Sequence, residues 1–244
     1  MLKNYFKIAF RNLLKNKVYS FINISGLAIG MAATILIGLW VADELGYNDY
    51  FKKKSKIAQI FQHQTSNGVI ETDAAVPRPL EFEIRKDYAD NFEYVVMSSW
   101  TQPRYLKYGE TNIYRAGNAM QENGPEMLNL RIIEGVKDGL KEKKSIMLSQ
   151  STAKALFGSE QAVGKIIKVN SEDDLAVTAI YEDIPENNSF SDMDYIFPWK
   201  HYITTQPWVE RSAEYWDNNS FQMFVQINEN TSMDEVTSKI THIK

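Results

Sequence analysis

The sequence of 244 residues lacks cysteine altogether and contains only three histidines. Without cysteine there are no disulfide bonds, thiolate metal sites, cysteine nucleophiles or cysteine-linked lipid anchors. The histidines, His63, His201 and His242, are far apart and show no metal-ligand spacing. A glycine-rich phosphate loop is also missing, so the chain has no such motif for ATP. We therefore expect no catalytic residue, no cofactor and no metal site.

Carboxylate pairs are the remaining candidates for acid–base chemistry. They fall in segments expected to be polar turns or a strand end: Asp173 and Asp174, Glu182 and Asp183, Asp192 and Asp194. Aspartate and glutamate are mostly solvated surface residues, so we interpret these pairs as turn residues. A membrane-anchored enzyme is the weakest of the function classes considered.

Acidic residues are absent from residues 1–17, which carry five basic residues and a formal charge of +5. Because the whole chain has a net charge of −4, the other 227 residues sum to −9. Nucleic-acid binding would need a basic face on the folded part, so no nucleic-acid partner is expected. A basic head on an acidic body suits contact with an anionic membrane surface at one end.

Charge of either sign is absent from residues 18–42, between Lys17 and Asp43. As a helix these 25 residues would be about 37 Å long, against a hydrocarbon core of about 30 Å. Tyr19 and Trp40 lie near the two ends, where aromatic rings favour the interface. A cleaved signal peptide has a shorter apolar run and small residues at its cleavage site. The pattern therefore predicts a membrane-spanning helix over 18–42.

Two helical faces are predicted to make contacts. In the span, small residues recur at every fourth position, which lets another helix approach closely: Gly26, Gly30, Thr34 and Gly38. The alternative is that glycine is simply common in such helices. In residues 1–17, apolar residues follow helical spacing on one side: Leu2, Tyr5, Phe6, Ala9, Phe10, Leu13 and Leu14. Basic residues expected to contact lipid headgroups follow it on the other: Lys3, Lys7, Arg11 and Lys15.

Orientation is predicted from the immediate flanks of the span. Lys15 and Lys17 precede it, whereas Asp43 and Glu44 follow it. Further lysines come soon after the span: Lys52, Lys53, Lys54 and Lys56. Because long domains translocate largely regardless of charge, we expect the first flank to dominate and the N-terminus to lie in the cytoplasm.

The remaining residues, 43–244, are predicted to form a mixed α/β domain, which makes the fold class α+β. Helical character is expected to continue to about Lys54. Strands are predicted at 57–63, 69–70, 94–97, 104–108, 111–115, 145–148, 165–169, 175–181 and 221–227. Helices are predicted after Pro77 and Pro79, at 152–157 and from Ser232 onward. Local signals include the turn Ser66-Asn67-Gly68 and a capping box of Ser232 with Glu235.

Several longer motifs resemble a known family. Residues 1–17, MLKNYFKIAFRNLLKNK, and 21–31, FINISGLAIGM, are similar to the first cytoplasmic helix and first span of the permease subunit of MacB/FtsX-type ABC transporters, abundant in Bacteroidetes-like bacteria. Residues 43–51, DELGYNDYF, resemble the family's post-membrane pattern DELSYD-x-F, with Gly46 and Asn48 as departures. The similarity continues at 149–158, SQSTAKALFG, at 163–167, VGKII, and at 179–189, AIYEDIPENNS.

The resemblance implies an extracytoplasmic domain with a porter-like α/β subdomain split in sequence and a second subdomain inserted into it. The two porter-like parts would lie near residues 57–100 and 221–244, and the insertion near 101–220. It also implies a cytoplasmic ABC ATPase as partner, a second copy or a related permease, further spans, and a place in the cell inner membrane with the main domain in the periplasm. Because an apolar helical stripe still runs at Lys244, we expect a chain cut short at its C-terminus.

Two functions of different classes are predicted. The first is the N-terminal portion of a permease subunit of an ABC-type efflux or mechanotransmission transporter, with no catalytic residue of its own. It would couple ATP hydrolysis by a partner to movement of its periplasmic domain. The alternative is a single-pass, membrane-anchored extracytoplasmic binding or regulatory module, which would fold by itself and bind a ligand through residues 43–244.

Overall fold

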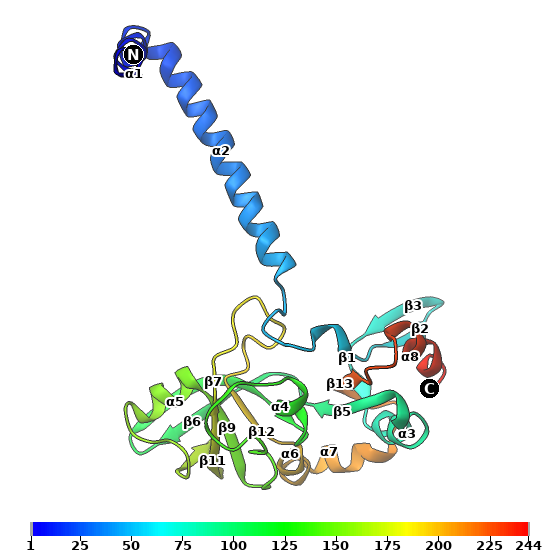
Figure 1. The fold of residues 1–244 in the computed structure, drawn as a ribbon. Coiled ribbons are helices and arrows are strands. Elements are labelled where there is room, and N and C mark those ends of the chain that lie inside the picture. Colours follow the sequence, from blue (N-terminus) through cyan, green and yellow to red (C-terminus); the bar gives the residue numbers. More distant parts are fainter. Residues whose placement is uncertain (1, 244) are drawn as a thin grey trace. The chain divides into compact units, whose positions relative to one another are not determined.

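The chain forms two compact units that meet between Tyr47 and Asn48. The computed structural model describes residues 2–243. The first unit consists of two helices, α1 (Leu2–Lys15) and α2 (Lys17–Leu45), which Figure 1 shows in blue. They are separated at Asn16, whose φ of −109° and ψ of 57° are not helical. At 1.5 Å per residue, the 29 residues of α2 extend over about 43 Å.

The helix α2 ends at Leu45, so the prediction of helical character to about Lys54 is wrong. The Gly46 N–H donates to Ala42 O at 3.1 Å and the Tyr47 N–H donates to Glu44 O at 3.2 Å, which closes the last turn. Asn48 then adopts a φ of +63°, in the left-handed region that asparagine tolerates and a continuing helix excludes. Turns follow as far as a short 3-10 helix, η1 (Lys54–Lys56).

The second unit, called the globular unit below, is built on one large sheet. Within residues 48–243 its order is β1-β13-β5-β7-β12-β9-β11-β10-β6, with β4 beside β13 and β8 beside β11. The strands on the path are β1 (Ile57–Gln59), β5 (Phe92–Ser98), β6 (Gln102–Tyr108), β7 (Thr111–Met120), β9 (Ser145–Ser149), β10 (Ile166–Val169), β11 (Asp173–Tyr181), β12 (Tyr195–Pro198) and β13 (Asn219–Ile227). The two side strands are β4 (Val76–Pro77) and β8 (Ile132–Gly135).

Six of these strands close into a ring, because β6 at the end of the path also pairs with β7. The pairs β7–β12 and β9–β11 are parallel, whereas β12–β9, β11–β10, β10–β6 and β6–β7 are antiparallel. Closure leaves these strands without free edges. The helix α5 (Gln150–Phe157) packs against the ring, and its N-cap is Ser149, whose side chain accepts a hydrogen bond from the Thr152 N–H.

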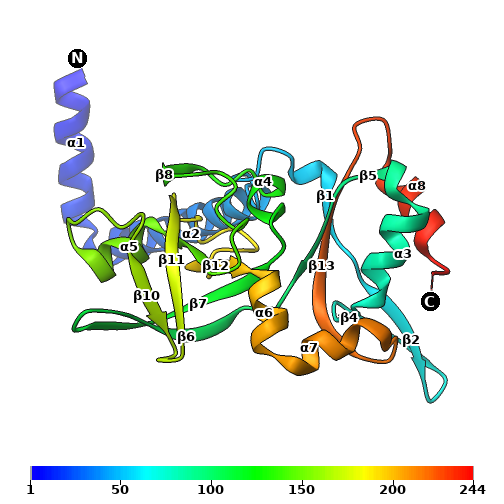
Figure 2. The same cartoon turned by 90° about the horizontal axis from the view of Figure 1, so that it is seen from below.

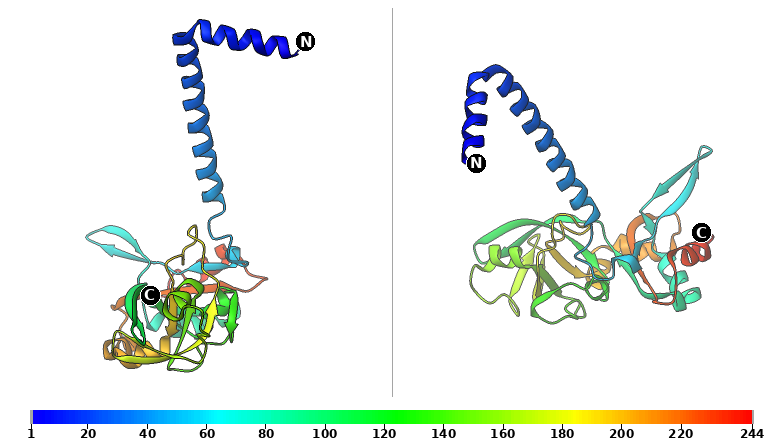
Figure 3. Two further views of the ribbon diagram at one scale, coloured as in Figure 1. Left: turned by 90° about the vertical axis from the view of Figure 1, so that its left-hand side faces the viewer. Right: turned by 45° about the horizontal axis from the view of Figure 1, so that its top comes forward.

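The other end of the sheet is open and combines the two ends of the globular unit's sequence. Here β13 pairs antiparallel with both β1 and β5. The helices α3 (Pro79–Asp87) and α8 (Met233–Ile240) lie side by side against these strands (Figure 2). A separate hairpin of β2 (Gln62–Ser66) and β3 (Val69–Asp73) projects from the unit (Figure 3). Its turn has positive φ at Asn67 and Gly68, as the sequence predicted.

The ring and the open end are joined by a narrow pairing of β5 with β7, at Ser98 and Met120. Two short helices, α6 (Trp199–Thr205) and α7 (Pro207–Arg211), brace this junction. The rings of Trp199 and Trp208 lie 5.3 and 5.5 Å from the ring of Phe221 on β13. Strand β12 therefore connects to the open end through aromatic packing as well as through the sheet.

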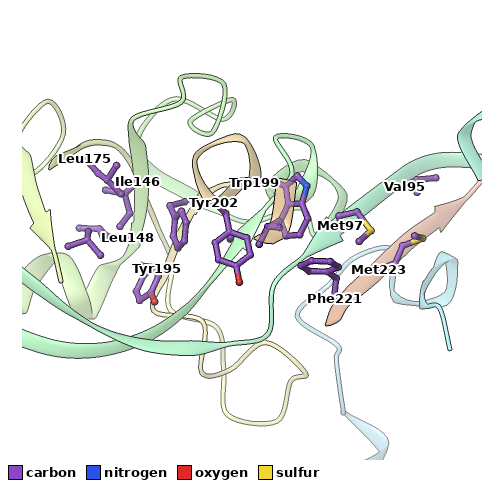
Figure 4. Close-up of a cluster of buried hydrophobic side chains, with 14 of the residues drawn as sticks. Val95, Met97, Ile146, Leu148, Leu175, Tyr195, Trp199, Tyr202, Phe221 and Met223 are labelled. Carbon is purple, nitrogen blue, oxygen red and sulfur yellow. The ribbon is translucent and has the colours of Figure 1, made fainter. Parts of the chain in front are cut away.

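The buried core runs without interruption from the ring into the open end. Figure 4 shows this continuity, from Ile146 and Leu175 in the ring to Met223 on β13. A second buried cluster occupies the other face of the sheet and includes Phe51, Val96, Met147 and Phe224. It is closed by the short helix α4 (Gly124–Met127) and by the loop between β11 and β12. The unit is therefore an α+β fold, as predicted.

Candidate membrane-contact and helix-packing site

The predicted packing face lies along one side of α2. A Cβ atom built on Gly26, Gly30 or Gly38 meets no other atom within 4 Å, so the surface there is open. The hydroxyl of Thr34 donates to Gly30 O at 2.9 Å and so does not project as a polar group. Gly26, Gly30 and Thr34 line a shallow hollow together with Leu27, Met31 and Ile35, and a second helix could pack there backbone to backbone.

No side chain of α2 is buried, although the helix is apolar on all sides. A helix of this kind is stable only inside a large core or in a bilayer. By length and composition, Lys17–Leu45 is the helix within residues 2–243 that could cross a membrane. The predicted span of 18–42 falls inside it.

The predicted lipid-contact residues lie on α1, as the helical spacing required. Lys3, Lys7, Arg11 and Lys15 are exposed, and so are apolar side chains on the rest of the helix, including Phe6 at 75% and Phe10 at 64%. An exposed aromatic face beside a basic face has the chemistry of a helix lying in a membrane interface. The assignments of both helical faces stay predictions, since they concern partners outside the chain.

One contact in the globular unit joins two titratable side chains and was not predicted from the sequence. His201 on α6 is buried, and its Nε2 lies 3.3 Å from Asp173 Oδ2 at the start of β11. The approach does not form a hydrogen bond, and the imidazole packs edge-on against Phe197 at 5.8 Å. No sequence signal could have linked residues this far apart. Among residues 2–243, no group of three or more His, Asp or Glu side chains could hold a metal ion.

Several of the carboxylates that we interpreted as turn residues make specific contacts or lie partly buried in the structure. Asp173 and Asp174 begin β11, and Asp174 pairs with Lys168 at 2.9 Å. Asp183 accepts the N–H of Ser151 at the start of α5. Asp194 is half-buried next to β12, and burial raises the pKa of its carboxyl above 3.8, opposed by Arg115 and the Ala116 N–H. These groups hold loops and helix ends in place.

A large hollow of the globular unit lies between the open sheet and its two helices. It measures about 650 Å³ and is bounded by β1, β2, α3, α8 and β13. Apolar side chains dominate its wall, including Ile60, Leu80, Ile84, Val236 and Ile240. Among residues 2–243, no lysine, arginine, aspartate or glutamate lines it. The hollow could take an uncharged, apolar group.

The fold is shared with several known structures. A domain assigned to a permease protein of Porphyromonas gingivalis matches with a TM-score of 0.63 and 18% identity, over 78% of this chain and 80% of that one. The periplasmic region of MacB from Actinobacillus actinomycetemcomitans gives 0.57 and 12%, over 78% and 83%. The extracellular domain of the noncanonic ABC-type transporter YknZ from Gram-positive bacteria gives 0.52 and 16%, over 75% and 87%. At these identities the likeness concerns the fold alone.

No curated protein matches the sequence significantly. The family described as the MacB-like periplasmic core domain, in contrast, matches residues 20–243. That match begins within α2 and covers the described part of the globular unit. The chain therefore belongs to the MacB-like periplasmic core domain family, which is a family of ABC transporter permeases.

Proposed function

We propose that this chain provides the first span and the extracytoplasmic domain of a permease subunit in an ABC-type efflux or mechanotransmission transporter. In this role a cytoplasmic ABC ATPase supplies the energy, and the globular unit moves in response. The observation that carries the proposal is the single family match over residues 20–243, which joins α2 to the globular unit. The chain contributes mechanical parts and no catalytic residue.

Each part has a place in this proposal. The helix α1 lies on the cytoplasmic face of the inner membrane, with Lys3, Lys7, Arg11 and Lys15 on anionic headgroups. The face of Gly26, Gly30, Thr34 and Gly38 packs against a span of a second copy or of a related permease. In the periplasm, residues 57–100 and 221–244 form a porter-like subdomain, and residues 101–220 form the inserted one. The pairing of β13 with both β1 and β5 supports this division.

Assembly tests the proposal directly. Purified in mild detergent from membranes of its own bacterium, the chain is expected to bring an ABC ATPase and further membrane helices with it. Gly30→Leu places a large side chain in the packing face. A loss of about 1.4 kcal/mol of association free energy there would lower the recovery of the partner proteins about tenfold. Ala28→Leu is the matched control, because residues 28 and 30 are separated by 200° around the helix. Absence of any ATPase from the wild-type preparation would refute the proposal.

Orientation can be tested because the chain has no cysteine. Single cysteines at Lys15 (K15C) and Lys143 (K143C) occupy exposed positions, one on α1 and one in the globular unit. A membrane-impermeant maleimide is expected to label K143C in intact spheroplasts and K15C only after permeabilisation. The reverse pattern would place the globular unit in the cytoplasm and exclude the proposed topology.

A second candidate function, an anchored binding module, is favoured by the hollow of about 650 Å³, which no charged side chain of residues 2–243 lines. That volume lies in the range of small-molecule sites. Val236→Trp would fill the hollow from α8. If the hollow binds a ligand, uncharged amphipathic molecules should raise the melting temperature of the wild-type chain and leave that of the variant unchanged. Equal responses of the two proteins would exclude the hollow as the binding site.

A further inference from the structure

Two motifs that lie far apart in the sequence meet in the globular unit. One is the segment that follows α2 and includes Asn48 and Phe51, and the other is the loop 182–194 between β11 and β12. The Asn48 amide donates to Ser189 Oγ at 2.9 Å and accepts the Ser189 N–H at 2.8 Å. The Asn48 N–H donates to Asn187 O at 3.0 Å. The side chain of Asn48 thus binds one residue of the loop through both of its polar atoms.

An aromatic series continues this attachment into the central sheet. Phe51 is only 4% exposed, and its ring lies 5.7 Å from that of Phe190, nearly perpendicular to it. The ring of Phe190 lies 5.0 Å from that of Phe224, which belongs to β13 and pairs with Val96 of β5. Edge-to-face pairs at these distances are favourable beyond their buried area. Phe51 is therefore connected through Phe190 and Phe224 to strands β13 and β5. Strand β5 leads to the junction between the open end and the six-stranded ring.

The neighbouring residues reinforce the same segment. The guanidinium of Arg131 lies 5.0 Å from the centre of the Tyr50 ring, and Arg131 pairs with Glu182 at 3.0 Å. Lys53 pairs with Glu93 next to the start of β5, also at 3.0 Å. Residues 48–56 are thus attached both to the ring side and to the open end before the chain enters β1.

We propose that Asn48, Phe51, Ser189 and Phe190, together called the clasp, form the mechanical connection that delivers movement of α2 to the globular unit. This inference rests on the proposed function, in which such movement does the work. Only Gly46 and Tyr47 separate Leu45, the last residue of α2, from Asn48. Three Cα–Cα steps can span at most roughly 11 Å. Once this connection is extended, any further displacement of the end of α2 pulls on the clasp before it pulls on β1.

Force spectroscopy on the full chain in lipid nanodiscs tests the clasp. Handles are attached through single cysteines at Glu44 (E44C) on α2 and Lys143 (K143C) in the globular unit, in a chain that has no other cysteine. If the clasp bears load, its opening is a discrete step that frees residues 48–56, about 30 Å of chain. The wild type is expected to show this step only at a measurable force. Release of that length at the lowest resolvable force would overturn the proposal.

Variants identify the residues that carry the load. Asn48→Ala with Ser189→Ala, and separately Phe51→Ala, are expected to lower the force of the first step. Asn48→Asp, whose carboxylate still accepts hydrogen bonds from the Ser189 N–H and hydroxyl, should keep the force of the first step close to that of the wild type. Phe157→Ala is the control, because it removes a similarly buried aromatic side chain from α5, outside the clasp. It should lower the force of later unfolding steps without changing the force of the first step. An unchanged first step in both clasp variants would refute the assignment.

The measurement requires no ATPase and no transport. A failure of the chain to assemble with an ATPase would therefore count against the proposed function and leave the load-bearing result intact. An assembled, working transporter whose clasp variants open at wild-type force would count against the clasp alone.

Discussion

Gln121 joins the end of β7 to β5 and α3 through its side-chain amide. Its Oε1 accepts the Met97 N–H at 2.9 Å and Arg85 Nη2 at 3.1 Å, and its Nε2 donates to Glu81 Oε1 at 2.5 Å. The Glu81 residue is only 6% exposed, and Met97 is fully buried. The amide therefore satisfies one buried backbone donor and one buried carboxylate where the ring meets the open end.

Replacement of Gln121 by alanine leaves the Met97 N–H unpaired and takes one donor from Glu81, which keeps Arg85 at 2.9 Å. An unpaired buried donor costs about 1–3 kcal/mol, and the loss of one of the two hydrogen bonds to Glu81 adds the typical value of about 1 kcal/mol. We expect the free energy of unfolding to fall by about 2–4 kcal/mol. For a unit of this size the melting temperature should fall by roughly 5–15 °C.

Guanidinium unfolding of the chain in nanodiscs, followed by tryptophan fluorescence, measures this change, and hydrogen exchange at the Met97 amide locates it. Glu122→Ala is the control, because it removes only an exposed pair with Lys200, worth about 0–1 kcal/mol. The exchange of acid and amide in Gln121→Glu with Glu81→Gln should recover part of the loss. A Gln121→Ala stability within about 0.5 kcal/mol of wild type would refute the reasoning.

Three further predictions concern single groups of the globular unit. Because burial raises the pKa of Asp194, the folded state holds its proton more tightly than the unfolded state, so the unfolding free energy should fall as pH rises from 3.8 through that higher pKa. Asp194→Asn should abolish this fall in denaturation series over that pH range, and an unchanged pH dependence would contradict the assignment. Tyr181→Phe removes a buried hydroxyl that donates to Met193 O at 2.6 Å and should lower the unfolding free energy by about 1–2 kcal/mol; no loss in a denaturant titration would argue against that bond. Gly117→Ala puts a Cβ 2.2 Å from Tyr195 O and should cost about 3 kcal/mol, so a wild-type melting temperature would exclude this close contact of β7 with β12.

Local signals predicted much of the fold correctly because they act within a few residues. The Asn67-Gly68 turn, the stop at Gly158 with its φ of +64°, and the acceptance of Glu235 N–H by Ser232 are all present. Such features depend on backbone conformations that few residues adopt and need no knowledge of the rest of the chain. The long apolar run also predicted α2, since length and the absence of charge are sufficient.

Strand β12 and the closure of the ring could not be predicted in the same way. All four residues of β12, Tyr195 to Pro198, are buried, so they show no alternation of apolar and polar side chains. The pairing of β6 with both β7 and β10 depends on register across distant segments. For the same reason the contact between His201 and Asp173 could not be predicted, although the fold places His201 Nε2 3.3 Å from Asp173 Oδ2. The end of α2 was misplaced because Asn48 adopts its left-handed conformation while bound to Ser189.

The pairing of β13 between β1 and β5 has a consequence for how the protein is made. Val95 pairs with Val225, roughly 130 residues later in the chain. Closing a flexible loop of that length carries an entropy penalty of about 4 kcal/mol. During synthesis, β1, α3 and β5 are therefore made before β13, the central strand of their sheet. The ring strands lie between β5 and β13 in the sequence, so they are complete earlier and can fold. We expect the ring to form first and to bring residues 98 and 219 together, so that the open end is completed last.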